Sequence, residues 1–492
     1  MNKKITLAVL SLAAFLMVSA GAFAQGSAAR FVKNQLKTDS LFTHSVVGIK
    51  AVNEHGKVIA EWNSTMPLLT ASTMKTLTTG MGLKYLGKDF RYETKVVYSG
   101  KVSDGVLYGD IIIVGGGDPT LGSKDTLATP IDKVFGEWSE GMKKAGINKI
   151  TGNIVVDDSY FVREQMPDSW SWGDFGEDYG AAPSGLTFCE NCQELEVIPG
   201  EKEGDPVQVN QVYPVVPGLK IVNKLTTGSE KDGNEAAYFV QDFARCASYE
   251  GQFGRARKVY HPLQSCRFPQ LACGNEFAKF IVANGFQFNG EIVDITEYAK
   301  KDYAKAAVEV AKTYSPELWR IVLVTNRISQ NLFAETILKT IGKVLAGEGS
   351  YDAALDKMYE LYKENGISTF GFRQADGSGL SRKDHVSPTF FCNYYNMMAK
   401  SDVFPEFFLS LPVPGHGGTL KSVLKDEPAK LKERIHAKSG SLNGVKCYAG
   451  YVQAGKKNGL IRFAILTNNY CYPTSAVQPK IEGFMKALAQ ED

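Results

Sequence analysis

Residues 71–75 read "ASTMK" and stand shortly after Pro67, at the start of a segment with the composition of a helix. Residues three positions apart lie on one face of a helix, so the hydroxyl of Ser72 and the amine of Lys75 are expected to point the same way. A serine hydroxyl is a weak nucleophile at neutral pH, and a neighbouring base activates it. The stretch therefore predicts a nucleophile beside its base.

The S-x-x-K spacing is a weak signal by itself. A second match, Ser422 and Lys425 in "SVLK", occurs in the same chain, and about one or two chance matches are expected at ordinary serine and lysine frequencies. Taken alone, Ser72 is also a typical helix N-cap residue followed by a solvated lysine. The functional interpretation therefore depends on further motifs.

Two further motifs follow in the order that accompanies S-x-x-K in β-lactamases and penicillin-binding proteins, where an S-D-N triplet precedes K-T-G. Here "RISQNLFAE" supplies Ser329 and Asn331, and "IHAKSGSL" supplies Lys438, Ser439 and Gly440. The first triplet stands just before a predicted helix, and the second begins a predicted strand. The three motifs together predict one active site.

The first two motifs fit attack on a D-alanyl amide. Ser72 is the expected nucleophile that forms an acyl-enzyme, and Lys75 is the expected base, provided that burial or crowding lowers its pKa. Ser329 is placed to relay the proton to the leaving amine. Asn331 is expected to orient Lys75 or the substrate amide.

The third motif fits recognition of the substrate. Lys438 and Ser439 are expected to bind its terminal carboxylate through charge-assisted hydrogen bonds. Gly440 has no side chain, which we expect to let the substrate lie close to the strand as an added edge. The backbone N–H groups of Ser72 and Ser441 are the expected oxyanion hole, at about 3 kcal/mol per donor.

At this point the chain resembles the low-molecular-mass class C penicillin-binding proteins, the D-alanyl-D-alanine carboxypeptidase/endopeptidases. The resemblance covers nearly the whole mature chain, through phrases such as "LYGDIIIVGGGDPTL", "YGAAPSGLTFCEN", "DGSGLSR" and "KSGSLNGVKCYAGYV". Ser72 and Ser329 lie 257 positions apart (329 − 72), which implies the long insertion of this family. Departures are S-Q-N for S-D-N, Ser439 for threonine and Asp384 for a commoner asparagine.

The predicted fold is α+β, with a penicillin-binding/β-lactamase-like domain whose antiparallel sheet is flanked by helices. Strand-turn-strand patterns near both ends of the chain predict one shared sheet. A β-rich insertion of one or two domains is expected at residues 90–294. The serine D,D-peptidase domain would then comprise residues 25–89 and 295–492, after a signal peptide at residues 1–24 with Lys3, Lys4 and a small-residue cleavage site.

Composition limits the partners. The net charge of +2, from 55 basic and 53 acidic residues, gives no case for a nucleic-acid partner. No later stretch reaches the length of a membrane span, so a periplasmic or secreted protein is expected. Its expected partners are peptidoglycan peptides and β-lactam antibiotics, and no cofactor or metal is implied by the motifs.

The eight cysteines favour disulfides in an oxidising compartment. The Cys189-x-x-Cys192 pair lacks the second half of a zinc site, and a cross-strand disulfide between Cys447 and Cys471 is a hypothesis. Two alternative functions stay open at this point. One is a serine β-lactamase, which the long insertion disfavours, and the other is a catalytically silent wall-binding scaffold on the same fold.

Overall fold

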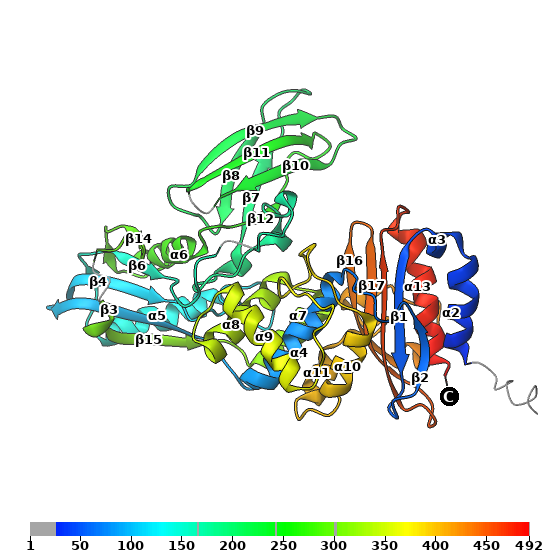
Figure 1. Ribbon diagram of the computed structural model, residues 1–492. Coiled ribbons are helices and arrows are strands. Elements are labelled where there is room, and N and C mark those ends of the chain that lie inside the picture. The colour runs from blue at the N-terminus through cyan, green and yellow to red at the C-terminus, as the bar shows by residue number, and fades with distance from the viewer. Residues whose placement is uncertain (1–25, 165–166, 242–243, 300–302, 492) are drawn as a thin grey trace, which may run out of the picture.

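The computed structural model describes residues 26–164, 167–241, 244–299 and 303–491. The signal peptide expected at residues 1–24 lies outside these residues. The molecule is elongated, with a five-stranded sheet at one end, a larger sheet at the other, and a smaller β body that rises beside their junction (Figure 1). The predicted α+β architecture with a β-rich insertion is confirmed.

The two ends of the chain share one antiparallel sheet, as the two hairpin patterns predicted. Its strand order is β16-β17-β18-β1-β2, and Ile465 of the central strand pairs with Ile49 on one side and Tyr448 on the other. The strands are β1 Val46–Val52, β2 Val58–Trp62, β16 Ile435–Leu442, β17 Val445–Gln453 and β18 Leu460–Asn468.

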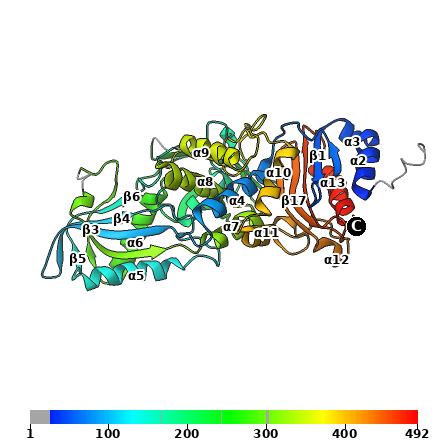
Figure 2. The same cartoon turned by 60° about the horizontal axis from the view of Figure 1, so that its bottom comes forward.

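Helices cover both faces of this sheet, which explains why β17 and β18 are buried along almost their whole length. One face packs against α2 Ser27–Thr38, α3 Ser40–Thr43 and α13 Thr474–Ala489. The other faces a helical layer (Figure 2). That layer contains α4 Met74–Leu86, α7 Leu318–Ile328, α8 Asn331–Ala346, α9 Tyr351–Glu364, α10 Pro388–Met398 and α11 Phe404–Ser410, and the short α12 Ala429–Lys432 precedes β16.

Helix α4 lies in the middle of the helical layer. Ten of its 13 residues are buried, including Lys75 and several threonines, and its contacts run to both α7 and α8. A helix that is enclosed on all sides can remove a charged side chain from water. Thr73 and Met74, which lie between Ser72 and Lys75, therefore already belong to the protein core.

The insertion begins with a mixed sheet that packs on two helices, α5 Ile131–Lys144 and α6 Pro269–Ala283. Its strands are β3 Glu93–Ser103, β4 Val106–Val114, β5 Lys149–Ile150, β6 Ile154–Asp157, β13 Gln287–Phe288, β14 Ile292–Asp294 and β15 Val308–Tyr314. Because β15 pairs with β3, this sheet extends past the boundary expected at residue 294. We propose that the insertion ends near residue 314.

The smaller β body consists of two three-stranded sheets around one apolar core. One sheet contains β7 Cys192–Ile198, β8 Gln208–Tyr213 and β12 Leu263–Ser265, and the other contains β9 Lys220–Gly228, β10 Asn234–Val240 and β11 Cys246–Gly254. The insertion thus has two parts, within the range of one or two domains that the sequence predicted.

The predicted disulfides are wrong, because all eight cysteines have free thiols in the structure. Cys447 pairs across the sheet with Leu466, whereas Cys471 is exposed and lies beyond the end of β18. The two thiols therefore do not face each other. Cys189 and Cys192 also have free thiols.

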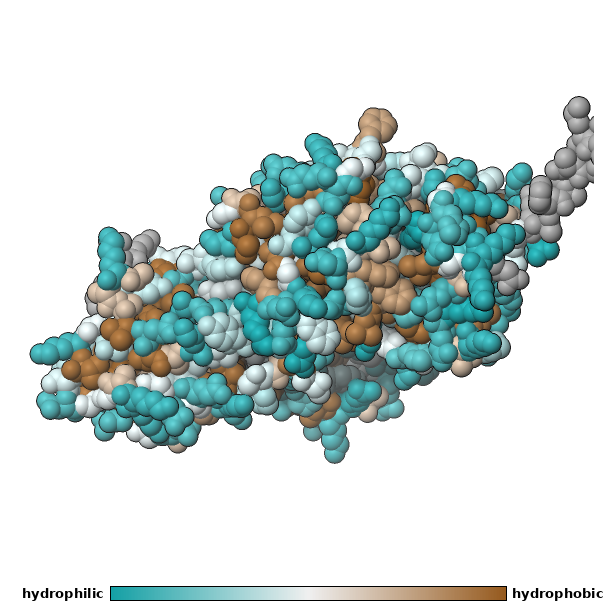
Figure 3. Space-filling model, turned by 90° about the horizontal axis from the view of Figure 1, so that it is seen from below, coloured by the Kyte–Doolittle hydropathy of each residue, from teal (hydrophilic) through white to brown (hydrophobic). Residues whose placement is uncertain are grey.

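No helix in the described ranges has both the length and the apolar character needed to cross a membrane. The space-filling view shows one elongated face, on which hydrophobic and hydrophilic residues are interspersed from end to end (Figure 3).

Replacement of Phe463 by alanine tests the core beneath the shared sheet. Phe463 is fully buried and meets Phe484 of α13 edge-on, with 6.5 Å between ring centroids. We expect Phe463→Ala to lower the free energy of unfolding by about 3–5 kcal/mol, measured by urea titration. The control is Phe370→Ala, whose ring is 99% exposed. Equal losses in the two variants would contradict this packing.

Candidate active site

Ser72 lies on a strained turn. It belongs to the 3-10 turn η1, Ala71–Thr73, which leads directly into α4, and Ala71 has a φ of +45°. Two glycines press on this turn: a Cβ at Gly379 would lie 1.9 Å from Ala71 O, and one at Gly440 would lie 2.6 Å from Thr70 O. A conformation of this kind persists only where its surroundings enforce it.

Lys75 follows Ser72 by one helical turn and its amine is enclosed. Its Nζ lies 2.9 Å from Ser72 Oγ, 2.6 Å from Asn331 Oδ1 and 2.8 Å from the carbonyl oxygen of Ser378. The side chain has no exposed surface. Burial lowers the pKa of Lys75 to about 8, although nearby carboxyl groups oppose that shift. The structure therefore brings together the first motif and Asn331, as predicted.

A buried carboxyl group holds the loop that contacts Lys75. Glu335 lies one turn after Asn331 on α8 and accepts hydrogen bonds from the backbone N–H groups of Gly377 (2.9 Å) and Ser378 (2.7 Å). Burial, and then the neighbouring Asp376, raise the pKa of Glu335 to about 8. One face of α8 thus supports Lys75 twice, directly through Asn331 and indirectly through Ser378.

Asp376 and Asp384 complete this support. Asp376 accepts hydrogen bonds from the backbone N–H groups of Gly379 (2.6 Å) and Ser381 (2.7 Å) and from the Trp170 indole (2.9 Å). Asp384 accepts one from Ala375 N at 2.7 Å. Burial, and then Asp376, raise the pKa of Asp384 well above its usual range.

The second and third motifs meet through Lys438. Its Nζ lies 3.0 Å from Ser329 Oγ and 2.8 Å from the carbonyl oxygen of Ser439. Burial, followed by the charges of Lys75 and Lys446, lowers the pKa of Lys438 well below its usual range. Within the part of the chain that the structure describes, no carboxylate forms an ion pair with this amine.

Strand β16 is the edge of its sheet and carries the whole third motif. Its outward direction is known because Ala437 N donates to Pro412 O, at 3.0 Å. N–H groups of alternate residues point to the same edge, so those of Ser439 and Ser441 also point outward. The Ser441 hydroxyl is exposed and accepts a hydrogen bond from Lys446 at 2.8 Å.

Gly440 has a different physical role from the one that we expected from the sequence. Its missing side chain would point into the protein, within 3.0 Å of both Ala71 Cβ and Ser72 N. Glycine at this position therefore allows β16 to approach the turn that carries Ser72. The close contact fixes the strand relative to the nucleophile.

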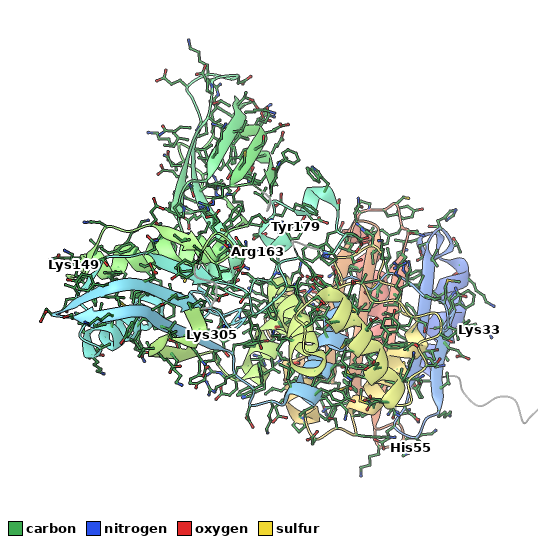
Figure 4. The ribbon with its side chains drawn as sticks, turned by 60° about the vertical axis from the view of Figure 1, so that its left-hand side comes forward. Lys33, His55, Lys149, Arg163, Tyr179 and Lys305 are labelled. Atoms are coloured by element: carbon green, nitrogen blue, oxygen red, sulfur yellow. The ribbon has the colours of Figure 1, made fainter. Side chains whose placement is uncertain are left out.

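A cavity of about 450 Å³ opens onto this group. Its lining includes Ser72, Ser329, Asn331 and Ser441, together with Tyr179 from the insertion. Tyr179 lies where the insertion meets the helical layer (Figure 4). The cavity is thus lined by the first two motifs, by Ser441 directly after the third motif and by one segment of the insertion.

Sequence reasoning did not identify several residues that build the site. Ser378 and Asp376 belong to "DGSGLSR", a phrase that carried the family resemblance but no role. Glu335 and Lys446 lay at helix and strand spacing without any local signal of their contacts. A local sequence motif cannot reveal Glu335 and Lys446, because their partners lie about 40 or more residues away or on another strand.

Replacement of Glu335 by alanine tests the support behind Lys75. The variant leaves the buried N–H groups of Gly377 and Ser378 without their acceptor, which we expect to lower the free energy of unfolding by about 3 kcal/mol. Urea titration measures the loss. The control is Glu360→Ala on the exposed side of α9, and a loss no larger than that of the control would contradict the role of Glu335.

Comparison with known proteins identifies the family. The model described as the D-Ala-D-Ala carboxypeptidase 3 (S13) family matches residues 32–491. The D-alanyl-D-alanine carboxypeptidase of Actinomadura sp. (strain R39) is 28% identical over 84% of this chain and 76% of its own.

Solved structures share the fold. Penicillin binding protein 4 from Haemophilus influenzae superposes with a TM-score of 0.79 at 21% identity, covering 94% of this chain and 98% of its own. The same protein complexed with a β-lactam gives a TM-score of 0.74 at 20% identity, with the same coverage. With the family match over nearly its full length, the chain belongs to the D-Ala-D-Ala carboxypeptidase 3 (S13) family.

Proposed function

We propose that this chain is a serine D-alanyl-D-alanine carboxypeptidase that cleaves the D-alanyl peptide bond of peptidoglycan stem peptides through an acyl-enzyme on Ser72. One observation carries the proposal. The amine of Lys75 is fully buried and lies 2.9 Å from Ser72 Oγ. A serine so placed has the adjacent base that nucleophilic attack needs.

In the first step, Lys75 in its neutral form accepts the proton of Ser72 while Oγ attacks the carbonyl carbon. The lowered pKa of Lys75, about 8, supports this role because a substantial fraction of the amine is neutral near that pH. Asn331 and the Ser378 carbonyl hold Nζ in place. No large rearrangement of the side chain is then needed.

The oxyanion is stabilised by the N–H groups of Ser72 and Ser441. The outward direction of the Ser441 N–H on the edge of β16 supports this assignment, and so does the contact of Gly440 with Ser72 N. Donors fixed before the reaction stabilise the developing charge without reorganisation.

The second step releases the leaving amine. Ser329 Oγ lies 3.0 Å from Lys438 Nζ, and this hydroxyl relays to the leaving nitrogen the proton that Lys75 took from Ser72, as the C–N bond breaks. Lys438 and Ser439 bind the terminal carboxylate of the substrate, because the buried Lys438 amine has no carboxylate partner among the described residues and an anionic ligand would favour its charged form. Water then hydrolyses the acyl-enzyme.

D,D-endopeptidase activity on cross-linked stem peptides is the second candidate function. It breaks the same kind of bond with a longer leaving amine. A second cavity of about 360 Å³ shares Tyr179, Ser329 and Asn331 with the first, which supports room for an extended substrate.

β-Lactams are proposed ligands because their ring amide mimics the scissile bond. Residues 1–24 are proposed to direct the chain to the periplasm or outside the cell.

Release of D-alanine tests the proposed nucleophile. We expect the wild type to release D-alanine from a synthetic peptide that ends in D-Ala-D-Ala, and Ser72→Ala to lower kcat/KM by about 10⁴-fold or more. The matched control is Ser422→Ala, which removes the exposed serine of the second S-x-x-K. Rapid nitrocefin turnover without D-alanine release would indicate a β-lactamase, and no turnover of either would indicate a silent scaffold.

The pH dependence tests Lys75. Its pKa is lowered to about 8, and the neutral amine is the active base, so the acylation rate constant is expected to rise about tenfold per pH unit below 8 and level off above it. Lys75→Arg should abolish the rise, since arginine stays protonated. A wild-type rate that is flat or falls between pH 6 and pH 8 would exclude Lys75 as the base.

A further inference from the structure

The insertion reaches the second motif through two hydrogen bonds. Asn331 Nδ2 donates to the carbonyl oxygen of Tyr179 at 2.8 Å, and Gln330 Nε2 donates to Glu190 Oε2 at 2.5 Å. Tyr179 and Glu190 both belong to the insertion, whereas Gln330 and Asn331 begin α8 of the peptidase domain. The second contact uses a carboxylate that has no part in the chemistry described above.

The backbone around Glu190 is unusual. Cys189, Glu190 and Asn191 have φ angles of +51°, +56° and +51°. Left-handed conformations of residues other than glycine cost on the order of 1–3 kcal/mol each and cluster at functional sites. Three in succession within one segment therefore require strong support from their surroundings.

That support comes from Asn191, which is fully buried. Its Oδ1 accepts a hydrogen bond from Phe188 N at 3.0 Å, and its Nδ2 donates to Ala182 O at 2.7 Å. Its carbonyl oxygen accepts a further one from Cys266 N at 2.7 Å. The turn is thus fixed from three sides, and it presents the Glu190 side chain in one direction.

Both ends of the Glu190–Gln330 contact are themselves fixed. Glu190 Oε1 accepts a hydrogen bond from Ser123 Oγ, so each carboxylate oxygen has its own donor. Gln330 Oε1 accepts one from Leu332 N at 3.3 Å, which caps the start of α8. The amide of Gln330 therefore has its oxygen on the helix and its nitrogen on the insertion.

Gln330, which makes this contact, is the one residue between Ser329 and Asn331 of the site. Ser329 ends α7 in a left-handed conformation with φ of +67°, and Asn331 is the first residue of α8. A rotation of the backbone at Gln330 would move Ser329 Oγ away from Lys438 Nζ and Asn331 Oδ1 away from Lys75 Nζ. These atoms lie 3.0 Å and 2.6 Å apart.

We propose that Glu190 is a positioning residue for catalysis, which acts through Gln330 to hold Ser329 and Asn331 in register with the two lysines. The insertion then has a defined task in the reaction: it clamps the second motif from outside the peptidase domain. This inference rests on the proposed roles of Ser329 and Lys75. It predicts that the rate of acylation, and not the binding of the ligand, depends on Glu190.

An exchange of the two side chains tests the contact. Glu190→Ala removes the acceptor, and Gln330→Glu sets two carboxylates against each other while keeping the acceptor that caps α8. In the double variant Glu190→Gln/Gln330→Glu, the donor and acceptor are reversed at equal side-chain length. Acylation by a fluorescent penicillin is followed by stopped flow, which separates the dissociation constant of the first complex from the acylation rate constant. Glu196→Ala is the matched control, because Glu196 lies on β7 and contacts Asn210.

We expect Glu190→Ala and Gln330→Glu each to lower the acylation rate constant by about tenfold or more, since small displacements at a reacting centre are costly. The dissociation constant should change by less than about threefold, and the double variant should recover to within about threefold of the wild type. Melting temperatures establish that each variant is folded.

The positioning role is overturned if the folded Glu190→Ala variant acylates at the wild-type rate, or if the double variant is no faster than Gln330→Glu. It is also overturned if only the dissociation constant changes. These results differ from a failure of the proposed function, in which the wild type itself would not be acylated.

Discussion

The burial of the Lys75 amine beside Ser72 is the constraint on which the rest of the structure depends. Removing an ammonium group from water is costly, and this cost lowers the pKa of Lys75 to about 8 even though nearby carboxyl groups oppose the shift. Only a large core can exclude water from it. The enclosed helix α4 provides that burial, and the pKa of Glu335 behind the site is raised as well.

The carboxyl groups near Lys75 influence the pKa of its amine. A fully ionised Glu335 or Asp384 would favour the charged ammonium and raise the pKa of Lys75. Burial, and then the neighbouring Asp376, instead raise the pKa values of both carboxyl groups, which weakens their pull on the charge of Lys75. Glu335 then acts chiefly as an acceptor for the loop that contacts Lys75.

Much of this architecture could be predicted from the sequence, because its signals are local. Ser72 and Lys75 share a helix face, and the terminal hairpins show strand alternation around short turns. Contacts that join distant segments had no such signal. The hydrogen bond from Gln330 to Glu190 spans 140 positions, β15 pairs with a strand about two hundred residues earlier, and Gly440 contacts the Ser72 turn instead of a ligand. Cysteine number suggested disulfides, but pairing depends on geometry that a count does not contain.

The most direct test of the account is mass spectrometry of the protein after incubation with benzylpenicillin. The account predicts that the intact mass increases by one penicillin, that the adduct maps to the peptide containing Ser72, and that Ser72→Ala shows no increase. An adduct on another residue would contradict the account. So would the absence of an adduct on the folded wild type under conditions that trap the acyl-enzyme before it is hydrolysed.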